Sequence, residues 1–253
     1  MKIDYNLQFN KNNRLKHFLN IQNLSKEHIN EIIDLADKYI KNKSNKFKDL
    51  EGKTIASLFF EPSTRTKTTF ELATKRLSAD FINIDIANSS TLKGESILDM
   101  IKTLEAMECD MFIVRHSSSG TPHYIAKEVG NKISIINAGD GIHAHPTQAM
   151  LDMYTIKKHK GNFENLNVSI VGDILHSRVA KSLIASLKIL SVKNINVIGP
   201  KNLMPENINE IGVNYFSNLE KGINHADVII MLRLQQERMK EAFISTEDYY
   251  NNY

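Results

Sequence analysis

The sequence predicts an α/β protein with two domains, each a parallel sheet flanked by helices. Short runs rich in β-branched and aromatic residues alternate with longer helical patterns, which is typical of βαβ units. The alternation occurs in two series, separated by a helical pattern at residues 145–160. With 253 residues, 42% of them hydrophobic, the chain can bury a core in each of two domains. We therefore expect domains at residues 1–147 and 148–253, although no linker rich in Pro, Gly or Ser marks the boundary.

The first series begins with an amphipathic helix and continues with four strands. In residues 24–40 apolar side chains recur near helical spacing, and Ser25 is the expected N-cap. Four apolar runs of strand length follow, at residues 54–60, 81–86, 111–115 and 132–137. Helical patterns fill most of the gaps between these runs, so a parallel sheet is expected.

The second series contains four more runs of strand length, again with helix-like spacers. They are residues 167–173, 195–200, 213–216 and 227–234. The first of these runs, "NVSIVGD", leads into "ILHSR" with one glycine, whereas a dinucleotide fingerprint needs the pattern G-x-G-x-x-G. We therefore expect a second parallel sheet that binds no nicotinamide cofactor.

Charge and composition favour a small-molecule partner. The net charge of +3 comes from 32 basic and 29 acidic residues that are well interleaved, so no basic stripe predicts binding to nucleic acid or a membrane. The single cysteine, Cys109, cannot form an intramolecular disulfide, and the first residues contain no apolar stretch typical of a signal peptide. We expect a soluble protein in the cytoplasm.

A candidate anion site follows the strand at residues 54–60. Pro62 ends that strand, and the stretch "STRT" occupies the N-cap and first turn of the next helix. Free backbone N–H groups and the positive end of the helix dipole favour a phosphate or carboxylate there, and Arg65 adds a planar charge. The alternative is equally good for this stretch alone: Ser63 is only a helix cap and Arg65 a surface residue.

Two further polar groups occur where strands of the first half end. Arg115 and His116 end the strand at residues 111–115, although a basic residue there is more often merely solvated. His145 and Gln148 begin the long helix after the glycine-rich turn "NAGDG", and His145 is either a hydrogen-bond donor or an ordinary cap. We expect no metal at the neighbouring His143, because no carboxylate or cysteine falls at ligand spacing around it.

The remaining candidates are a mobile cation and a second anion cluster. Lys93 lies in the polar loop "SSTLKGES", where a solubilising lysine is the simpler interpretation. In the second half, Arg178 lies near the start of a helix, and Arg233 and Gln235 are expected on the same side of a strand end. Together these residues predict a second site for an anionic ligand.

Six motifs in order resemble the aspartate carbamoyltransferase catalytic chain of the aspartate/ornithine carbamoyltransferase superfamily. They are "FFEPSTRT", "KGES", "RH", "NAGDG" with "HPTQ", "GDILHSR" and "RLQQER", and the resemblance runs over residues 25–253. It implies that the first domain binds carbamoyl phosphate and the second binds L-aspartate. The implied reaction gives N-carbamoyl-L-aspartate and phosphate in de novo pyrimidine biosynthesis, without a metal or another cofactor.

The resemblance also implies a role for each matched residue. Ser63, Thr64, Arg65, Thr66 and Arg115 resemble the phosphate cradle, and Thr66, Arg115 and His145 resemble the donors to the carbonyl oxygen. Gln148 resembles the residue that receives the carbamoyl amide, while Arg178, Arg233 and Gln235 resemble the contacts to aspartate. Lys93 and a loop serine, Ser89 or alternatively Ser90, come from the neighbouring subunit in the family. We therefore expect a homotrimer with shared sites, in which Lys93 also contacts aspartate; regulatory chains are conceivable partners.

Two alternatives and one departure accompany this resemblance. Ornithine carbamoyltransferases share S-T-R-T and H-P-x-Q, but they carry an S-M-G type loop where this chain has "RLQQER", and an arginine suits a dicarboxylate better than a diamine. A carbamoyltransferase-like binding or assembly subunit without turnover is the second alternative. The family pattern continues past Tyr253 with a loop and a terminal helix, so we expect an incomplete second domain.

Overall fold

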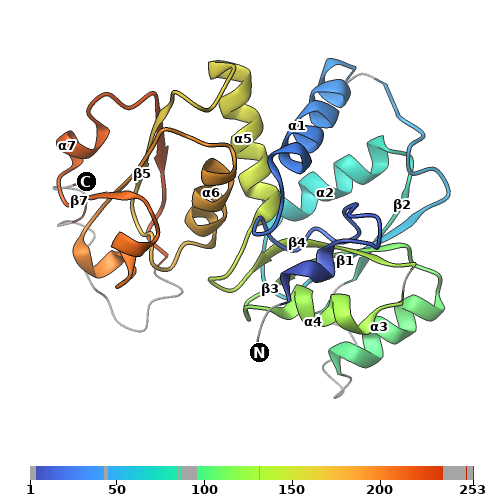
Figure 1. Ribbon diagram of the computed structural model, residues 1–253. Coiled ribbons are helices and arrows are strands. Elements are labelled where there is room, and N and C mark those ends of the chain that lie inside the picture. Colours follow the sequence, from blue (N-terminus) through green and yellow to red (C-terminus); the bar gives the residue numbers. More distant parts are fainter. Residues whose placement is uncertain are drawn as a thin grey trace. The chain divides into compact units, whose positions relative to one another are not determined.

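The computed structural model of the protein describes residues 4–42, 45–84, 86, 96–130, 132–235, 249 and 253 (Figure 1). The chain divides into two compact units. The first unit comprises Met1–Asn23 and Asp34–Gln148, and the second comprises Leu24–Ile33 and Ala149–Tyr253. Each unit contains one four-stranded parallel sheet, so the predicted fold class is confirmed.

The sheet of the first unit has the strand order β2-β1-β3-β4. Its elements in chain order are η1 (Tyr5–Gln8), β1 (Thr54–Phe59), α2 (Thr64–Arg76), β2 (Asp80–Ile84), α3 (Ile97–Ala106), β3 (Met111–His116), α4 (Thr121–Glu128) and β4 (Ser134–Asp140). All four predicted strands are present. β4 continues beyond its predicted end, because Asp140 still pairs with His116 of β3 after a shift in register.

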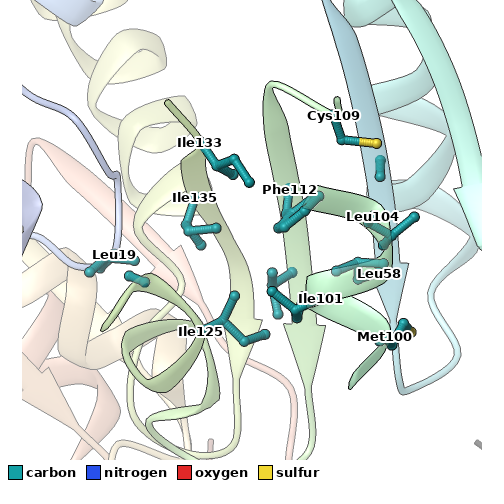
Figure 2. Packing of buried hydrophobic residues seen from close by; sticks show 13 residues of the cluster. Leu19, Leu58, Met100, Ile101, Leu104, Cys109, Phe112, Ile125, Ile133 and Ile135 are labelled. Carbon is teal, nitrogen blue, oxygen red and sulfur yellow. The ribbon is translucent and has the colours of Figure 1, made fainter. Parts of the chain in front are cut away.

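Successive side chains of the first sheet enter two separate hydrophobic clusters. Phe112 of β3 packs with Ile101 of α3 and Ile125 of α4, as Figure 2 shows. The next residue, Ile113, belongs to the other cluster, against which Phe70 of α2 packs. This alternation follows from the period of two in a strand. As a result, α3 and α4 cover one face of the sheet and α2 covers the other (Figure 1).

The sheet of the second unit has the order β7-β6-β5-β8. Its elements are β5 (Asn167–Val171), α6 (Arg178–Ile189), β6 (Asn194–Ile198), η4 (Lys201–Leu203), η5 (Ile208–Glu210), β7 (Asn214–Phe216), α7 (Leu219–Ile223) and β8 (Val228–Met231). β8 ends three residues earlier than predicted, at the residue that pairs with Val171, the last residue of β5. In both sheets the strand that comes first in the chain, β1 or β5, has a neighbour on each side.

Both strand orders place a topological switch point at a defined strand. β1 has β2 on one side and β3 on the other, and β5 likewise has β6 and β8 as neighbours. The chain thus turns in opposite directions after these strands. In open α/β sheets, ligands bind beyond the carboxyl ends of the strands at such a switch point. Ligand-binding residues are consequently expected in the loops after β1 and β3 in the first unit, and after β5 and β8 in the second.

Two long helices have residues in both units: α1 (Lys26–Lys41) and α5 (Pro146–Lys160). The predicted cap of α1 is confirmed, because the backbone N–H of His28 donates to Ser25 Oγ over 3.3 Å. Within the described part of the chain, no helix has the length and apolar character that crossing a membrane would require.

The segment that precedes α1 lies beside β4 and includes a buried histidine. Phe18 N donates to the Ile135 carbonyl oxygen over 2.8 Å, and Asn137 N donates to the Phe18 carbonyl oxygen over 2.9 Å. The neighbouring His17 is 1% exposed, and its Nδ1 accepts a hydrogen bond from Ile135 N at 3.1 Å. Burial, with a smaller contribution from Lys16, lowers the pKa of His17 from 6.5 to about 4. The imidazole is therefore neutral in the folded protein at pH 7.

We expect His17 to make the protein sensitive to acid. His17 is protonated in the unfolded chain below about pH 6.5, but in the folded chain only near pH 4. The free energy of unfolding is therefore highest, as far as His17 is concerned, above pH 6.5, and it decreases as the pH falls towards 4. The slope is at most about 1.4 kcal/mol per pH unit. Urea unfolding across this range should show a shallower pH dependence for His17→Gln than for the wild type. The exposed His159→Gln is the control; equal slopes in all three proteins would contradict the assignment.

Candidate functional site

The N-terminus of α2 offers a group of hydrogen-bond donors at the first switch point. Ser63 is its N-cap, and the Ser63 side chain makes no capping hydrogen bond. Thr64 and Arg65 are exposed, Thr66 is half-buried, and the first turn contains no acidic residue. Among the described residues Arg65 has no ion-pair partner. Backbone N–H groups, hydroxyls and a guanidinium therefore gather where an anion is electrostatically favoured.

β3 holds Arg115 against the chain that leads into α2. Arg115 pairs in register with Phe59, the last residue of β1, and is 13% exposed. Its Nε lies 2.8 Å from Glu61 Oε1, and its Nη1 donates to the Ala138 carbonyl oxygen at 3.2 Å. The structure thus brings the predicted Arg115 together with the stretch that contains Ser63. Glu61 was not predicted, because an acidic residue before a proline does not by itself reveal the arginine with which it pairs in the fold.

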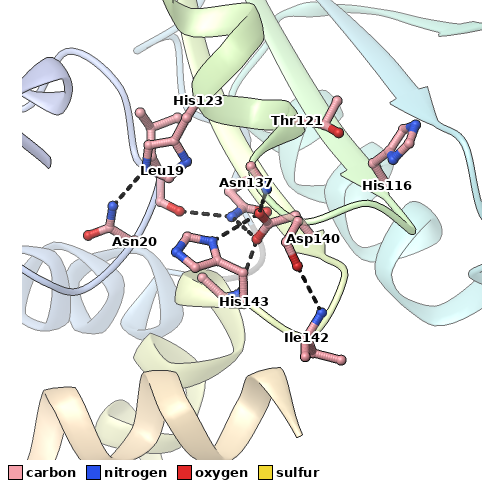
Figure 3. Close-up of polar contacts among 12 residues, drawn as sticks. Leu19, Asn20, His116, Thr121, His123, Asn137, Asp140, Ile142 and His143 are labelled. Carbon is pink, nitrogen blue, oxygen red and sulfur yellow. Dashed lines mark hydrogen bonds and ion pairs between the residues drawn. The ribbon is translucent and has the colours of Figure 1, made fainter. Parts of the chain in front are cut away.

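Asp140, the last residue of β4, anchors the loop that leads to His145. Its carboxylate is fully buried and accepts hydrogen bonds from Gly120 N at 2.7 Å and Ala144 N at 3.1 Å (Figure 3). The amide of Asn137 donates to the same carboxylate at 2.8 Å. The chain enters α5 directly after this loop. The sequence analysis noticed the glycines of "NAGDG" but missed the aspartate between them.

The predicted pair at the start of α5 follows this anchored loop. His145 is 8% exposed, and its Nδ1 lies 3.4 Å from Thr147 Oγ1. Gln148 is half-buried in the first turn of the helix. β4 is the neighbour of β3, so Arg115, near the carboxyl end of β3, and His145 and Gln148, beyond the carboxyl end of β4, belong to the same edge of the sheet. This edge of the first sheet collects every described residue that the sequence predicts for carbamoyl phosphate.

A cluster of two histidines and Asp140 lies next to the same loop. His143 Nδ1 is 3.0 Å from Asp140 Oδ2, and the ring of His123, in α4, is 5.4 Å from the His143 ring (Figure 3). One possible ligand atom from each of the three residues lies within 4.8 Å of the others. The expectation that no carboxylate is near His143 is wrong, because Asp140 precedes it by three residues. Burial lowers the pKa of His123 to about 4, aided by His143, so this imidazole is neutral at pH 7.

The second switch point also has a buried carboxylate at its centre. Asp173, in the loop after β5, accepts from His176 N at 3.0 Å and from Gln235 N at 3.3 Å, which links it to the segment after β8. Arg178, the first residue of α6, is 2% exposed. β8 ends before Arg233, so the expected same-side arrangement is wrong: Gln235 is buried and Arg233 exposed. The structure still brings Gln235 to the loop that leads to Arg178, and the sequence analysis missed Asp173.

The close approach of these two loops requires a glycine at position 172. Gly172 has φ +128°, and an added Cβ would lie 2.7 Å from the Leu232 carbonyl oxygen. We expect Gly172→Ala to lower the free energy of unfolding by about 3 kcal/mol or more, since backbone strain and a clash with backbone combine. Gly161→Ala is the control, because Gly161 has φ +81° with open space around it, and should cost about 1 kcal/mol. Denaturant unfolding would contradict the account if both variants were equally stable.

The loop serine and lysine of the prediction, Ser89 or Ser90 and Lys93, lie outside the described residues. These residues are therefore not included in the site described here. The remaining predicted residues fall at the two switch points, with one group in each unit.

Comparison with known proteins gives the same fold. Residues 16–158 match the family described as aspartate/ornithine carbamoyltransferase, carbamoyl-P binding domain. The catalytic subunit of M. jannaschii aspartate transcarbamoylase is 34% identical, with TM-score 0.80 over 94% of this chain and 79% of that one. Aspartate transcarbamoylase from Trypanosoma cruzi in complex with carbamoyl aspartate and phosphate is 29% identical, with TM-score 0.80 over 94% of this chain and 81% of that one.

Two parallel sheets, each with buried and charged polar residues at its switch point, define a two-domain α/β protein that binds small anionic ligands. The chain belongs to the aspartate/ornithine carbamoyltransferase family. The predicted resemblance to the aspartate carbamoyltransferase catalytic chain is confirmed.

Proposed function

We propose that this protein transfers the carbamoyl group of carbamoyl phosphate to the amine of L-aspartate, giving N-carbamoyl-L-aspartate and phosphate. The observation that carries the proposal is the anion site formed by the N-terminus of α2 and Arg115 at the switch point between β1 and β3. Aspartate transcarbamoylase from Trypanosoma cruzi, a similar structure, was solved in complex with carbamoyl phosphate and aspartate.

The phosphate end of carbamoyl phosphate suits the first turn of α2. Ser63, Thr64 and Thr66 provide hydroxyls beside the free backbone N–H groups, and Arg65 provides a charge-assisted pair of hydrogen bonds. The positive charge of Arg115 stabilises the negative charge that develops on the phosphate as it leaves. The leaving phosphate itself accepts the proton of the attacking amine, so the mechanism requires no protein base.

The carbonyl end of carbamoyl phosphate requires donors on its oxygen and an acceptor for its amide. When the amine forms the new C–N bond, electrons move onto the carbonyl oxygen before the C–O bond to phosphate breaks. We assign Thr66, Arg115 and His145 as donors to that oxygen, and Gln148 as the partner of the carbamoyl amide. Preorganised donors of this kind contribute about 3 to 4 kcal/mol each to lowering the barrier.

The carboxylates of aspartate suit the residues at the second switch point. Arg178 and Arg233 supply planar charges that bind carboxylates, and Gln235 supplies an amide. An arginine in "RLQQER" and the similarity to aspartate transcarbamoylases both favour aspartate over ornithine. In this proposal residues 1–147, together with Gln148, bind carbamoyl phosphate, and the rest of residues 148–253 binds aspartate.

The assembly and the pathway are further parts of the proposal. We assign Lys93 and Ser89 to the site of a neighbouring copy, which requires an oligomer, and the family resemblance favours a homotrimer. We place the reaction in pyrimidine biosynthesis in the cytoplasm. A regulatory chain is compatible with this assembly. Sedimentation at the concentration used for assays tests the shared site: a fully active monomer would contradict the assignment of Lys93.

Phosphate release gives the direct test of turnover. Purified protein with carbamoyl phosphate should release phosphate rapidly only when L-aspartate is present, beyond the slow spontaneous breakdown of carbamoyl phosphate. A folded protein that binds carbamoyl phosphate but gives no release above that background, at any aspartate concentration, would contradict the enzymatic function. It would instead indicate a binding or assembly subunit.

A further inference from the structure

We propose that His123, Asp140 and His143 form a binding site for a divalent transition-metal ion, for which Zn²⁺ is the probe. All three residues belong to the first unit, and the site lies at the base of the loop that leads to His145. The cluster is distinct from the proposed reaction, because none of its residues has a role in binding carbamoyl phosphate or aspartate. The inference therefore adds a second ligand to the protein and does not depend on its activity.

The donor set is the one that zinc prefers among common ions. Two imidazole nitrogens and one carboxylate oxygen are its usual ligands besides thiolates, and three protein ligands leave a fourth position for water. The three ligand atoms lie within 4.8 Å of one another, and Asp140 and His123 are at most 1% exposed. A tetrahedral ion with bonds of about 2 Å holds its ligand atoms about 3.3 Å apart, so the cluster contracts when the ion binds. Hard cations such as Mg²⁺ would favour a set with more oxygen atoms.

Neighbouring side chains already orient both imidazole rings. The Asn20 amide lies 2.9 Å from His123 Nε2 and, with the amide turned by half a rotation, Oδ1 accepts the Nε2 proton, which makes Nδ1 the ligand atom; Asp140 Oδ2 accepts from His143 Nδ1 at 3.0 Å (Figure 3). Metal-binding histidines characteristically donate the N–H of one ring nitrogen to an oxygen acceptor, which fixes the ring and its tautomer. The hydrogen bonds to Asn20 and Asp140 therefore fix the orientation of both imidazole rings for binding an ion.

Two buried polar atoms, one in the cluster and one beside it, provide a further observation. Among the described residues, His143 Nε2 and the Asn20 carbonyl oxygen Oδ1 have no hydrogen-bond partner, although both atoms are inaccessible to solvent. Asn20 as a whole is fully buried. Buried polar atoms almost always have a partner, so the unpaired His143 nitrogen, itself a candidate ligand atom, points to a bound ion, and the unpaired Asn20 oxygen points to the turned amide.

A bound ion would connect elements that are far apart in the sequence. His123 belongs to α4, whereas Asp140 and His143 flank the turn after β4. Asp140 also holds Gly120, just before α4, and Ala144, just before His145. An ion on this cluster adds a link between α4 and the loop, so its expected effect is to stabilise the first unit.

The test measures binding of Zn²⁺ to protein that has been freed of metal with a chelator. Calorimetric titration should show one tight equivalent in the wild type and its loss in both His123→Gln and His143→Gln. Asn20→Ala, which removes an orienting partner, should weaken binding about 10-fold to 100-fold. The exposed His159→Gln should bind as the wild type does. Co²⁺ in place of Zn²⁺ should give the visible absorption of a tetrahedral site.

Thermal unfolding with and without Zn²⁺ provides a second measurement on the same proteins. Zn²⁺ should raise the melting temperature of the wild type and of His159→Gln, because the ion binds the folded state alone. The two ligand variants should show no such increase. Absence of a tight equivalent in the wild type, or unchanged binding in both ligand variants, would overturn the proposal. Neither result bears on carbamoyl transfer.

Discussion

Arg65→Ala is expected to lower kcat/KM for carbamoyl transfer about 100-fold to 1000-fold, the usual effect of removing one preorganised donor. Arg65 is exposed at the first turn of α2 and makes no ion pair among the described residues. Its guanidinium is therefore available for substrate and contributes little to folding. Steady-state kinetics with both substrates varied would show the loss, while the free energy of unfolding should change by less than about 0.5 kcal/mol.

Arg76→Ala is the matched control for this variant. Arg76 is also an exposed arginine of α2, but it lies in the last turn, at the opposite end of the helix. Its removal should leave kcat/KM within about twofold of the wild type, since the effects of a surface substitution are small. Equal losses in the two variants would indicate a general effect of positive charge, and no loss in Arg65→Ala would contradict the anion site.

Asp140→Asn is expected to lower the free energy of unfolding by about 3 kcal/mol, and to reduce kcat because the loop before His145 loses its anchor. The carboxylate is fully buried and accepts hydrogen bonds from Gly120, Ala144 and Asn137. A hydrogen bond to a charged group contributes about 1.5 to 3 kcal/mol, and an asparagine would direct an NH₂ group at one of these donors. Denaturant unfolding and steady-state kinetics on the same preparation measure both effects.

Asp80→Asn controls for the loss of a negative charge. Asp80 is exposed at the start of β2, where its backbone N–H donates to the Lys53 carbonyl oxygen. This substitution should change stability by less than about 0.5 kcal/mol. If Asp140→Asn were equally mild, Asp140 would not be the anchor of the loop.

Local patterns in the sequence were sufficient to predict the sheets. A strand that is buried on both faces reads as a short apolar run, and each of the eight predicted runs contains a strand. The ends were less predictable, because they depend on pairing with a neighbour. β4 extends to Asp140 through its partner His116, and β8 stops at Met231, opposite the end of β5.

Some residues of the candidate site could also be predicted from local sequence patterns, whereas others could not. Ser63 and His145 were predictable because each directly precedes a helix that follows a strand. The cluster at His143 was not, since it depends on contacts between distant segments: Asn20 and His123 are 103 residues apart. Asp173 and Glu61 escaped prediction for the same reason, because an isolated acidic residue in a loop does not reveal the partner that it holds in the fold.

In the proposed function, the carbamoyl group of carbamoyl phosphate is transferred to L-aspartate and not to L-ornithine. The most direct measurement is a competition in which the purified protein receives carbamoyl phosphate with equal amounts of L-aspartate and L-ornithine, followed by mass spectrometry of the products. We expect N-carbamoyl-L-aspartate to be the carbamoylated product, and we expect its formation to be strongly reduced in Arg65→Ala. Formation of citrulline in its place would contradict the assignment of Arg178, Arg233 and Gln235 to a dicarboxylate.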